Sequence, residues 1–122
     1  MATFKKLAPV LFCNEIAPCL PFWERLGFVR AIEVPGFVIL AKDGIEVMYQ
    51  TRASAGADAP AALEGAGRAF VYLDVDDLDD VISRLGDAPV VVARRTAPYG
   101  ADEIFVREPA GHVIGFARPA PA

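Results

Sequence analysis

The segment Ile16–Thr51 reads IAPCLPFWERLGFVRAIEVPGFVILAKDGIEVMYQT, and its pattern decides the fold. Apolar residues recur at helical spacing from Ile16 to Leu26, and Gly27 ends the predicted helix. Turn pairs then separate three strand-like runs, which are Phe28–Val34, Phe37–Lys42 and Ile45–Thr51. Together with a strand-like run in front of it, Leu7–Cys13, the segment predicts one βαβββ module.

The second half of the chain repeats this order. A strand is predicted over 69–75, a helix over 76–85, and three more strands over 89–95, 103–107 and 112–118. Arg84-Leu85-Gly86 ends the second helix as Arg25-Leu26-Gly27 ends the first. The acidic cluster at 76–80 is interpreted as the start of a helix, where carboxylates favour the helix dipole, rather than as a metal site.

A module of about fifty residues cannot easily bury its sheet alone. We therefore predict one α+β domain with module 1 at about 5–52, a linker at about 53–67 and module 2 at about 68–118. Two βαβββ modules would form a paired, curved sheet around a shared cleft, with each helix covering the outer face of its own sheet.

Composition limits the classes of function. A chain of 122 residues that is 54% hydrophobic fits one domain, and no apolar run approaches the length of a membrane span. The first residues lack the pattern of a signal peptide, so a cytoplasmic location is the default. A net charge of −4 with scattered basic residues argues against nucleic acid as a partner. Cys13 and Cys19 lack zinc-ligand spacing and are expected to be free thiols.

Two segments resemble a known family. FWERLGF at Phe22–Phe28 and YGADEIFVREPAGH at Tyr99–His112 resemble the opening and closing segments of the vicinal oxygen chelate superfamily, which contains glyoxalases, bleomycin resistance proteins and dioxygenases. The closing segment resembles the bleomycin-resistance branch in particular. The resemblance covers about Leu7 to Ala117. It implies the paired βαβββ fold and a homodimer.

The same resemblance places four metal-ligand positions, one on each of four strands. They fall on Ala8, Glu46, Phe70 and Gly115. Alanine, phenylalanine and glycine cannot ligate a metal through a side chain, and one carboxylate does not hold a divalent ion. We therefore expect no metal ligands and no cofactor, and we assign the only histidine, His112, to packing or hydrogen bonding at a strand start.

Strand alternation predicts which side chains face the cleft. If the metal-ligand positions that the resemblance places point to the cleft, the predicted ligand-binding residues are Phe12, Glu46, Met48, Gln50, Phe70, Tyr72 and Asp74. The resemblance adds Glu103, because its stretch borders the cleft in the bleomycin-resistance branch. Such an apolar, aromatic cleft with a few carboxylates suits an aromatic or cationic small molecule. The same side chains would also serve to fill the gap between two sheets, and Glu103 with Arg107 would equally form an exposed charge pair; these interpretations stay open.

The sequence leaves three candidate functions. The favoured one is a metal-independent binding protein for a drug-like or natural-product molecule, as the resemblance to bleomycin resistance proteins implies. Antibiotic resistance is the role that this resemblance suggests, and the sequence itself does not fix the biological role. The alternative is a glyoxalase-type or dioxygenase-type lyase, isomerase or oxygenase with Glu46 as the catalytic group, although the sequence offers no nucleophile triad or phosphate-binding loop. A dimeric interaction module with a degenerate pocket is the third. The sequence does not name the ligand or fix the arrangement of the dimer.

Overall fold

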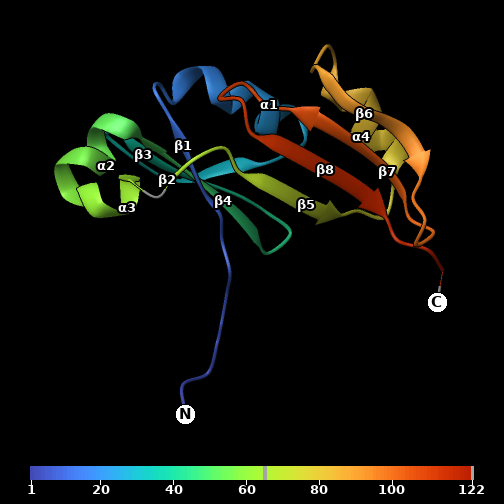
Figure 1. Cartoon of the computed structure of the whole chain (residues 1–122), viewed down its shortest axis with the longest axis horizontal. Helices are drawn as coiled ribbons and strands as arrows, with labels where there is room; N and C mark the ends of the chain where they lie inside the picture. The colour runs from blue at the N-terminus through green and yellow to red at the C-terminus, as the bar shows by residue number, and fades with distance from the viewer. Residues whose placement is uncertain (65, 122) are drawn as a thin grey trace.

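The computed structural model describes residues 1–64 and 66–121 and contains two four-stranded sheets (Figure 1). The first has the order β1-β4-β3-β2, and the second has the order β5-β8-β7-β6. In each sheet the first strand pairs in parallel with the last, and the remaining pairs are antiparallel. The strands are β1 (Val10–Cys13), β2 (Val29–Val34), β3 (Phe37–Lys42), β4 (Ile45–Thr51), β5 (Phe70–Asp74), β6 (Val90–Thr96), β7 (Asp102–Arg107) and β8 (Val113–Arg118). The identical order confirms the predicted α+β fold of two repeated modules.

The helix of the first module is shorter than the sequence predicts. A 3₁₀ turn, η1 (Ala17–Cys19), precedes α1 (Leu20–Arg25). Pro21 lacks the backbone N–H that a continuous helix from Ile16 would bond to the Ala17 carbonyl, so the regular α-helix starts later. Strand β1 likewise begins at Val10 rather than at Leu7, and Figure 1 shows the chain before it running away from the body of the molecule.

The hairpin between β3 and β4 has the turn that its sequence predicts. Asp43 and Gly44 both have positive φ values, 52° and 78°. Positive φ at both central residues is the geometry of a type I′ turn, whose twist matches the twist of antiparallel strands. The turn therefore fixes the register in which Lys42 pairs with Ile45 and Ala41 with Glu46.

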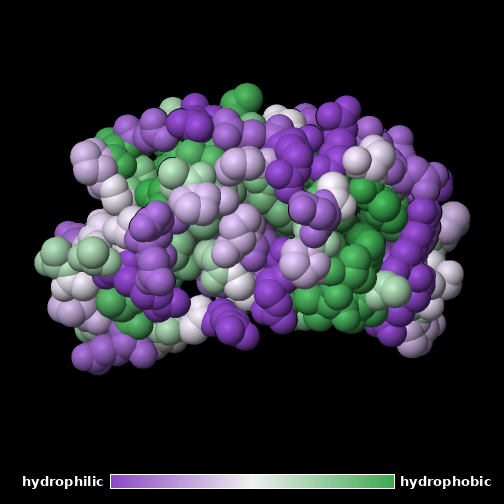
Figure 2. All heavy atoms as spheres, turned by 90° about the horizontal axis from the view of Figure 1, so that it is seen from above, coloured by the Kyte–Doolittle hydropathy of each residue, from purple (hydrophilic) through white to green (hydrophobic). Residues whose placement is uncertain are grey.

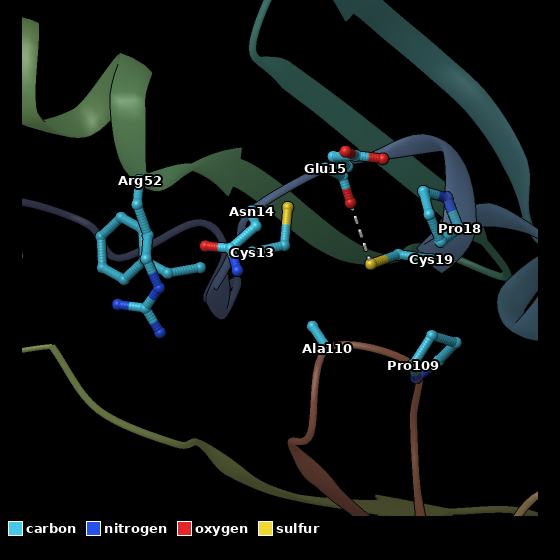
Figure 3. A pocket seen from close by; sticks show the side chains of 9 residues that line it. Cys13, Asn14, Glu15, Pro18, Cys19, Arg52, Pro109 and Ala110 are labelled. Carbon is cyan, nitrogen blue, oxygen red and sulfur yellow. Dashed lines mark hydrogen bonds between the residues drawn. The ribbon is translucent and has the colours of Figure 1, made fainter.

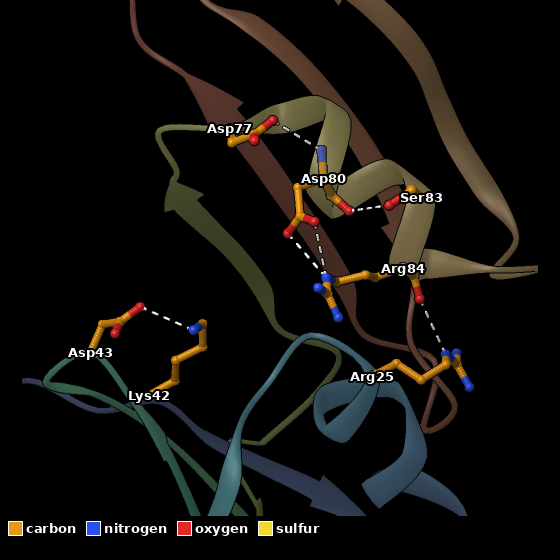
Figure 4. A network of polar contacts seen from close by, with 7 residues as sticks. All are labelled: Arg25, Lys42, Asp43, Asp77, Asp80, Ser83 and Arg84. Atoms are coloured by element: carbon orange, nitrogen blue, oxygen red, sulfur yellow. Dashed lines mark hydrogen bonds and ion pairs between the residues drawn. The ribbon is translucent and has the colours of Figure 1, made fainter.

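The acidic cluster of the second module lies at the start of α4 (Leu78–Leu85), as interpreted from the sequence (Figure 4). The Asp77 side chain accepts a hydrogen bond of 3.0 Å from the backbone N–H of Asp80 and caps the helix. The Asp80 carboxylate pairs with Arg84 four residues later, at 3.0 Å. Arg25 of the first module donates to the Arg84 carbonyl oxygen at 3.3 Å, so the ends of the two helices are in contact.

The connection between the modules contains more helix than the sequence predicts. Helix α2 (Arg52–Asp58) follows β4 directly, and α3 (Pro60–Glu64) comes next, within the predicted linker. The Thr51 side chain caps α2 by accepting a hydrogen bond of 3.1 Å from the Ser54 N–H. An N-cap threonine followed by alanine-rich sequence is a helix signal. None of the described helices has the length and apolar character to cross a bilayer.

A single apolar core joins both modules on the helix-covered side of the sheets. Leu11, Val47 and Tyr49 enter it from the first sheet, and Ile114 and Phe116 enter it from the second. In Figure 1, α1 lies near the junction of the two sheets, and its Trp23 is fully buried, as the sequence predicts. The opposite face of each sheet takes no part in this core.

A buried polar network crosses the junction of the modules. Trp23 Nε1–H donates to the Tyr49 hydroxyl at 2.8 Å, and that hydroxyl donates to Glu108 Oε2 at 2.5 Å. The other Glu108 oxygen accepts the His112 backbone N–H at 2.6 Å. The His112 ring accepts the Ala69 N–H at Nδ1 (2.7 Å), which leaves Nε2–H to donate to the Phe12 carbonyl at 2.8 Å. The predicted hydrogen-bonding role of His112 is confirmed, and its ring connects β1 to the start of β5.

Candidate functional site

Four of the predicted site residues share the helix-free face of the first sheet. Phe12 on β1 lies opposite Gln50 on β4, and Glu46 and Met48 precede Gln50 at alternate positions of the same strand. All four are half-buried, whereas the intervening residues of β4 point into the core. The strand period therefore places these side chains together on one surface.

Glu46 offers an acceptor to this face. Lys6 Nζ lies 2.8 Å from Glu46 Oε1 as an ion pair, but the contact lacks the angle of a hydrogen bond. Oε1 is buried and has no hydrogen-bond partner among the described residues. Lys6 belongs to the exposed N-terminal segment and its side chain is 49% exposed, so its displacement would cost little.

The other four predicted site residues share a face of the second sheet, together with Phe105 of β7. Phe70, Tyr72 and Asp74 alternate along β5 and are all exposed. The Phe70 and Phe105 rings meet edge to face with centroids 5.2 Å apart, and the Tyr72 and Phe105 rings do so at 6.0 Å. We call the surface formed by Phe70, Tyr72 and Phe105 the aromatic face.

Gly115 lies beneath the aromatic face. It pairs with Tyr72 on one side and with Phe105 on the other. A Cβ atom at this position would lie 3.0 Å from the Phe105 ring and 3.1 Å from the Tyr72 ring. The two rings therefore occupy the space that a side chain, and hence a metal ligand, would need here.

The residues at the four family metal positions do not fit a metal ion. Ala8, Phe70 and Gly115 lack donor atoms in their side chains, and the two rings cover Gly115. Within residues 1–64 and 66–121, no group of three or more His, Cys, Asp or Glu side chains is arranged to hold one. Glu46 alone would be a single carboxylate ligand.

Glu103 lies at the floor of the second face and is fully buried. Its Oε1 accepts hydrogen bonds from the hydroxyls of Tyr72, at 2.8 Å, and Tyr99. Its Oε2 accepts from Arg95 at 3.0 and 3.1 Å. The interpretation of Glu103 and Arg107 as an exposed charge pair is therefore wrong. The Glu103 carboxylate accepts its hydrogen bonds from other residues, and Arg107 donates to the Gly111 carbonyl at 2.8 Å.

These contacts make stability depend on pH through Glu103. Hydrogen bonds from Tyr99, then Tyr72 and Arg95, lower the pKa of the Glu103 carboxyl below its ordinary value of 4.5. A group with a lowered folded pKa stabilises the fold above its unfolded pKa, and that contribution is lost as the pH falls through the folded value. We expect Glu103→Gln to be less stable than wild type at pH 6, and the difference to shrink as the pH falls below 4.5. Urea unfolding across this range tests the expectation, and a difference that does not change with pH would contradict it.

Three residues of the second face were missing from the predicted site. Phe105 follows Glu103 by two positions, so strand alternation could have found it. Tyr99 lies in the loop between β6 and β7, where no periodicity indicates a direction. The contact of Arg95 with Glu103 depends on the register of β6 against β7, in which the two residues pair.

A separate hollow of about 310 Å³ lies near the end of β1 (Figure 3). Cys13 and Cys19 line it and are buried free thiols. Burial raises the pKa of both thiols, that of Cys19 to about 12, so both stay protonated near neutral pH. Since His112 uses both ring nitrogens elsewhere, a Cys/His nucleophile is not assembled here.

The two predicted halves of the site are not joined within one chain. No hydrogen bond, ion pair or aromatic contact links the four residues of the first face to the four of the second in the described parts of the chain. The second face is also open, with Phe70 63% and Tyr72 42% exposed. Figure 2, seen from above, shows a broad apolar patch on the half of the molecule that carries the second sheet, edged by hydrophilic atoms.

Known structures share this fold. A lactoylglutathione lyase from Agrobacterium tumefaciens superposes with a TM-score of 0.77 at 18% identity, covering 97% of this chain and 96% of that one. The bleomycin resistance determinant encoded on transposon Tn5 gives 0.73 at 17% identity, covering 95% and 98%. A bleomycin-binding protein complexed with bleomycin gives 0.71 at 18% identity, covering 94% and 98%. At these identities the likeness establishes the fold alone.

The family assignment rests on the sequence. No curated protein matches the chain. The model of the glyoxalase/bleomycin resistance protein/dioxygenase superfamily matches residues 6–116, which span both modules and every strand of the two sheets except the last residues of β8. The chain belongs to the glyoxalase/bleomycin resistance protein/dioxygenase superfamily.

Proposed function

We propose that this protein is a metal-independent binding protein for a planar aromatic or cationic small molecule, and that the aromatic face is its main contact surface. The observation that carries the proposal is the pair of exposed rings, Phe70 and Tyr72, which the half-buried ring of Phe105 meets edge to face over Gly115. Ordered, exposed rings offer stacking area to a flat ligand and cation–π contacts to a charged one. The lack of donor atoms at three of the four family metal positions supports metal independence.

The neighbours support the same class of function. A protein of this fold binds bleomycin, as its solved complex states, and another is a bleomycin resistance determinant. By this analogy the ligand would be a drug-like natural product, and the role would be resistance in the cytoplasm. Fold analogy gives a starting expectation for function and not a ligand.

We further propose that the protein acts as a homodimer in which each open sheet face is covered by a second copy. A dimer would place the face containing Glu46 against the aromatic face of the partner and enclose a cleft. The exposure of Phe70 and Tyr72 supports this, because large apolar patches on a single protomer commonly mark interaction surfaces. The resemblance to the family, which implies a homodimer, supports the same proposal.

The experiment is a calorimetric titration of chelator-treated protein with bleomycin, and then with a panel of aromatic, cationic natural products. We expect at least one compound to bind without added metal, and Phe70→Ala to weaken its binding about ten-fold or more, as for a central contact residue. Val29→Ala is the matched control, because Val29 is equally exposed, 63%, at the edge strand of the other sheet. Tight, stoichiometric binding of Ni²⁺, Mn²⁺, Fe²⁺ or Zn²⁺ would overturn metal independence, and unchanged affinity in Phe70→Ala would overturn the assigned face.

A catalytic function is the second candidate, and one observation favours it. Glu46 Oε1 is buried without a hydrogen-bond partner among the described residues, as a general base facing a substrate would be. Loss of turnover in Glu46→Gln, with affinity retained, would support an enzyme over a binding protein.

A further inference from the structure

The buried carboxylate of Glu103 collects donors from three separate segments. Tyr72 comes from β5, Tyr99 from the loop before β7, and Arg95 from β6. Both hydroxyls donate to the same oxygen, Oε1, while Arg95 binds Oε2. A carboxylate that is fully buried and so occupied is not available to a ligand without displacing its own partners.

Glu103 therefore controls what the two tyrosines present to solvent. A phenol has one hydroxyl hydrogen, and Tyr72 and Tyr99 both direct theirs inward to Glu103. Their hydroxyl oxygens lie 3.2 Å apart. What remains toward solvent is the ring faces and oxygen lone pairs, which attract cations and hydrogen-bond donors.

These two rings line a recess of about 310 Å³ at the edge of the second sheet. Asp74 also lines it and is exposed, and its carboxylate has no hydrogen-bond or ion-pair partner among the described residues. The nearby cation, Arg95, is bound to Glu103, so the charges of that pair offset each other. The recess thus combines one free carboxylate with two electron-rich rings. The remaining lining residues are Ala101, Pro119 and Ala120.

We propose that the recess lined by Tyr72, Asp74 and Tyr99 is a subsite for a cationic, hydrogen-bond-donating group of the ligand, and that Glu103 is its positioning residue. Glu103 acts by turning both tyrosine hydrogens inward, so that the two tyrosines present acceptors and ring faces to the recess. The inference rests on the proposed binding function, of which it names the ligand class. It also assigns Glu103 a role other than direct contact with the ligand.

The test compares two bicyclic probes of opposite charge, 1-methylquinolinium and quinoline-2-carboxylate, by equilibrium dialysis. We expect wild type to prefer the cation by about ten-fold or more. Glu103→Gln and Asp74→Asn should each weaken the binding of the cation and so bring the two affinities closer together. Asp87→Asn is the matched control, because it removes an exposed carboxylate away from the recess.

A spectroscopic readout tests the positioning role without any ligand. Hydrogen bonding to Tyr99, burial and then the Glu103 carboxylate raise the pKa of Tyr72 above its ordinary value of 10.0. In Glu103→Gln, tyrosinate absorbance should therefore develop at lower pH than in wild type, with the fold checked by circular dichroism. Tyr72→Phe in the Glu103→Gln background should remove this early ionisation.

The outcomes separate the two proposals. If neither probe binds wild type but the tyrosine ionisation shifts in Glu103→Gln, the binding function fails and the subsite with it, while the positioning of Tyr72 stands. If both probes bind and Glu103→Gln keeps the wild-type preference for the cation, the role of Glu103 is overturned although the binding function holds. A wild-type preference for the carboxylate would overturn the cationic subsite.

Discussion

Replacing His112 with alanine is expected to lower the free energy of unfolding by about 3 kcal/mol, because two buried hydrogen bonds disappear and their backbone partners stay buried. The Ala69 N–H and the Phe12 carbonyl would each lose the ring nitrogen that now pairs with it. The imidazole itself is 2% exposed, so its removal also leaves a cavity between the modules. Urea unfolding followed by tryptophan fluorescence measures the loss, since Trp23 lies in the same network.

Two further variants serve as comparisons for His112→Ala. Arg84→Ala breaks an exposed ion pair within α4 and should change stability by less than about 0.5 kcal/mol. Glu108→Ala should be comparably severe to His112→Ala, because it leaves the Tyr49 hydroxyl and the His112 N–H without their acceptor. Since the two residues belong to one network, the double variant should lose less than the sum of the single losses. A His112→Ala protein as stable as Arg84→Ala would show that the network does not hold the modules together.

Replacing Phe105 with alanine is expected to weaken ligand binding by about thirty-fold, the loss typical of a central aromatic contact. Phe105 is the middle ring of the aromatic face and touches both Phe70 and Tyr72. Its removal deletes stacking area and also releases the two outer rings from their edge-to-face arrangement. Calorimetric titration with the ligand identified for wild type measures the change.

Phe105→Leu is the matched control for this prediction. Leucine keeps apolar bulk over Gly115 but lacks the ring, so its affinity should fall between those of wild type and Phe105→Ala. Gly115→Ala perturbs the same face from beneath it, because the added Cβ would lie 3.0 Å from the Phe105 ring. If Phe105→Ala binds as tightly as wild type, the aromatic face is not the contact surface, whatever its exposure.

The sequence predicts the fold well because the fold depends on local signals. Turns that contain glycine, helix-ending glycines and period-two strands occur in both halves, and each acts within a few residues. The errors in the fold also have local causes. Pro21 delays the start of the regular helix α1. The Thr51 side chain caps an alanine-rich segment, which forms helix α2 where the sequence predicts a linker.

The site is less predictable because it depends on contacts between strands. Alternation placed Phe70, Tyr72 and Asp74 on one face and the family resemblance added Glu103, but neither could show that Glu103 is saturated. That saturation requires Tyr99 from a loop and Arg95 from a strand whose register against β7 shifts twice, and neither is readable from periodicity. Alternation also cannot place one sheet face relative to the other, so the predicted cleft remains a proposal that depends on a second copy.

The His112 ring has a consequence for the order of folding. Its bond to the Phe12 carbonyl joins residues 100 positions apart, whereas the hairpins of each module close over a few residues. Contacts between distant parts of a chain cost the most loop entropy and tend to form after local ones. We infer that each module gains its hairpins first and that the junction closes last. Interactions formed after the transition state govern the rate of unfolding rather than of folding. The lifetime of the native protein would then depend on how tightly the junction between the two modules is held, and the His112 ring is one of the contacts that hold it.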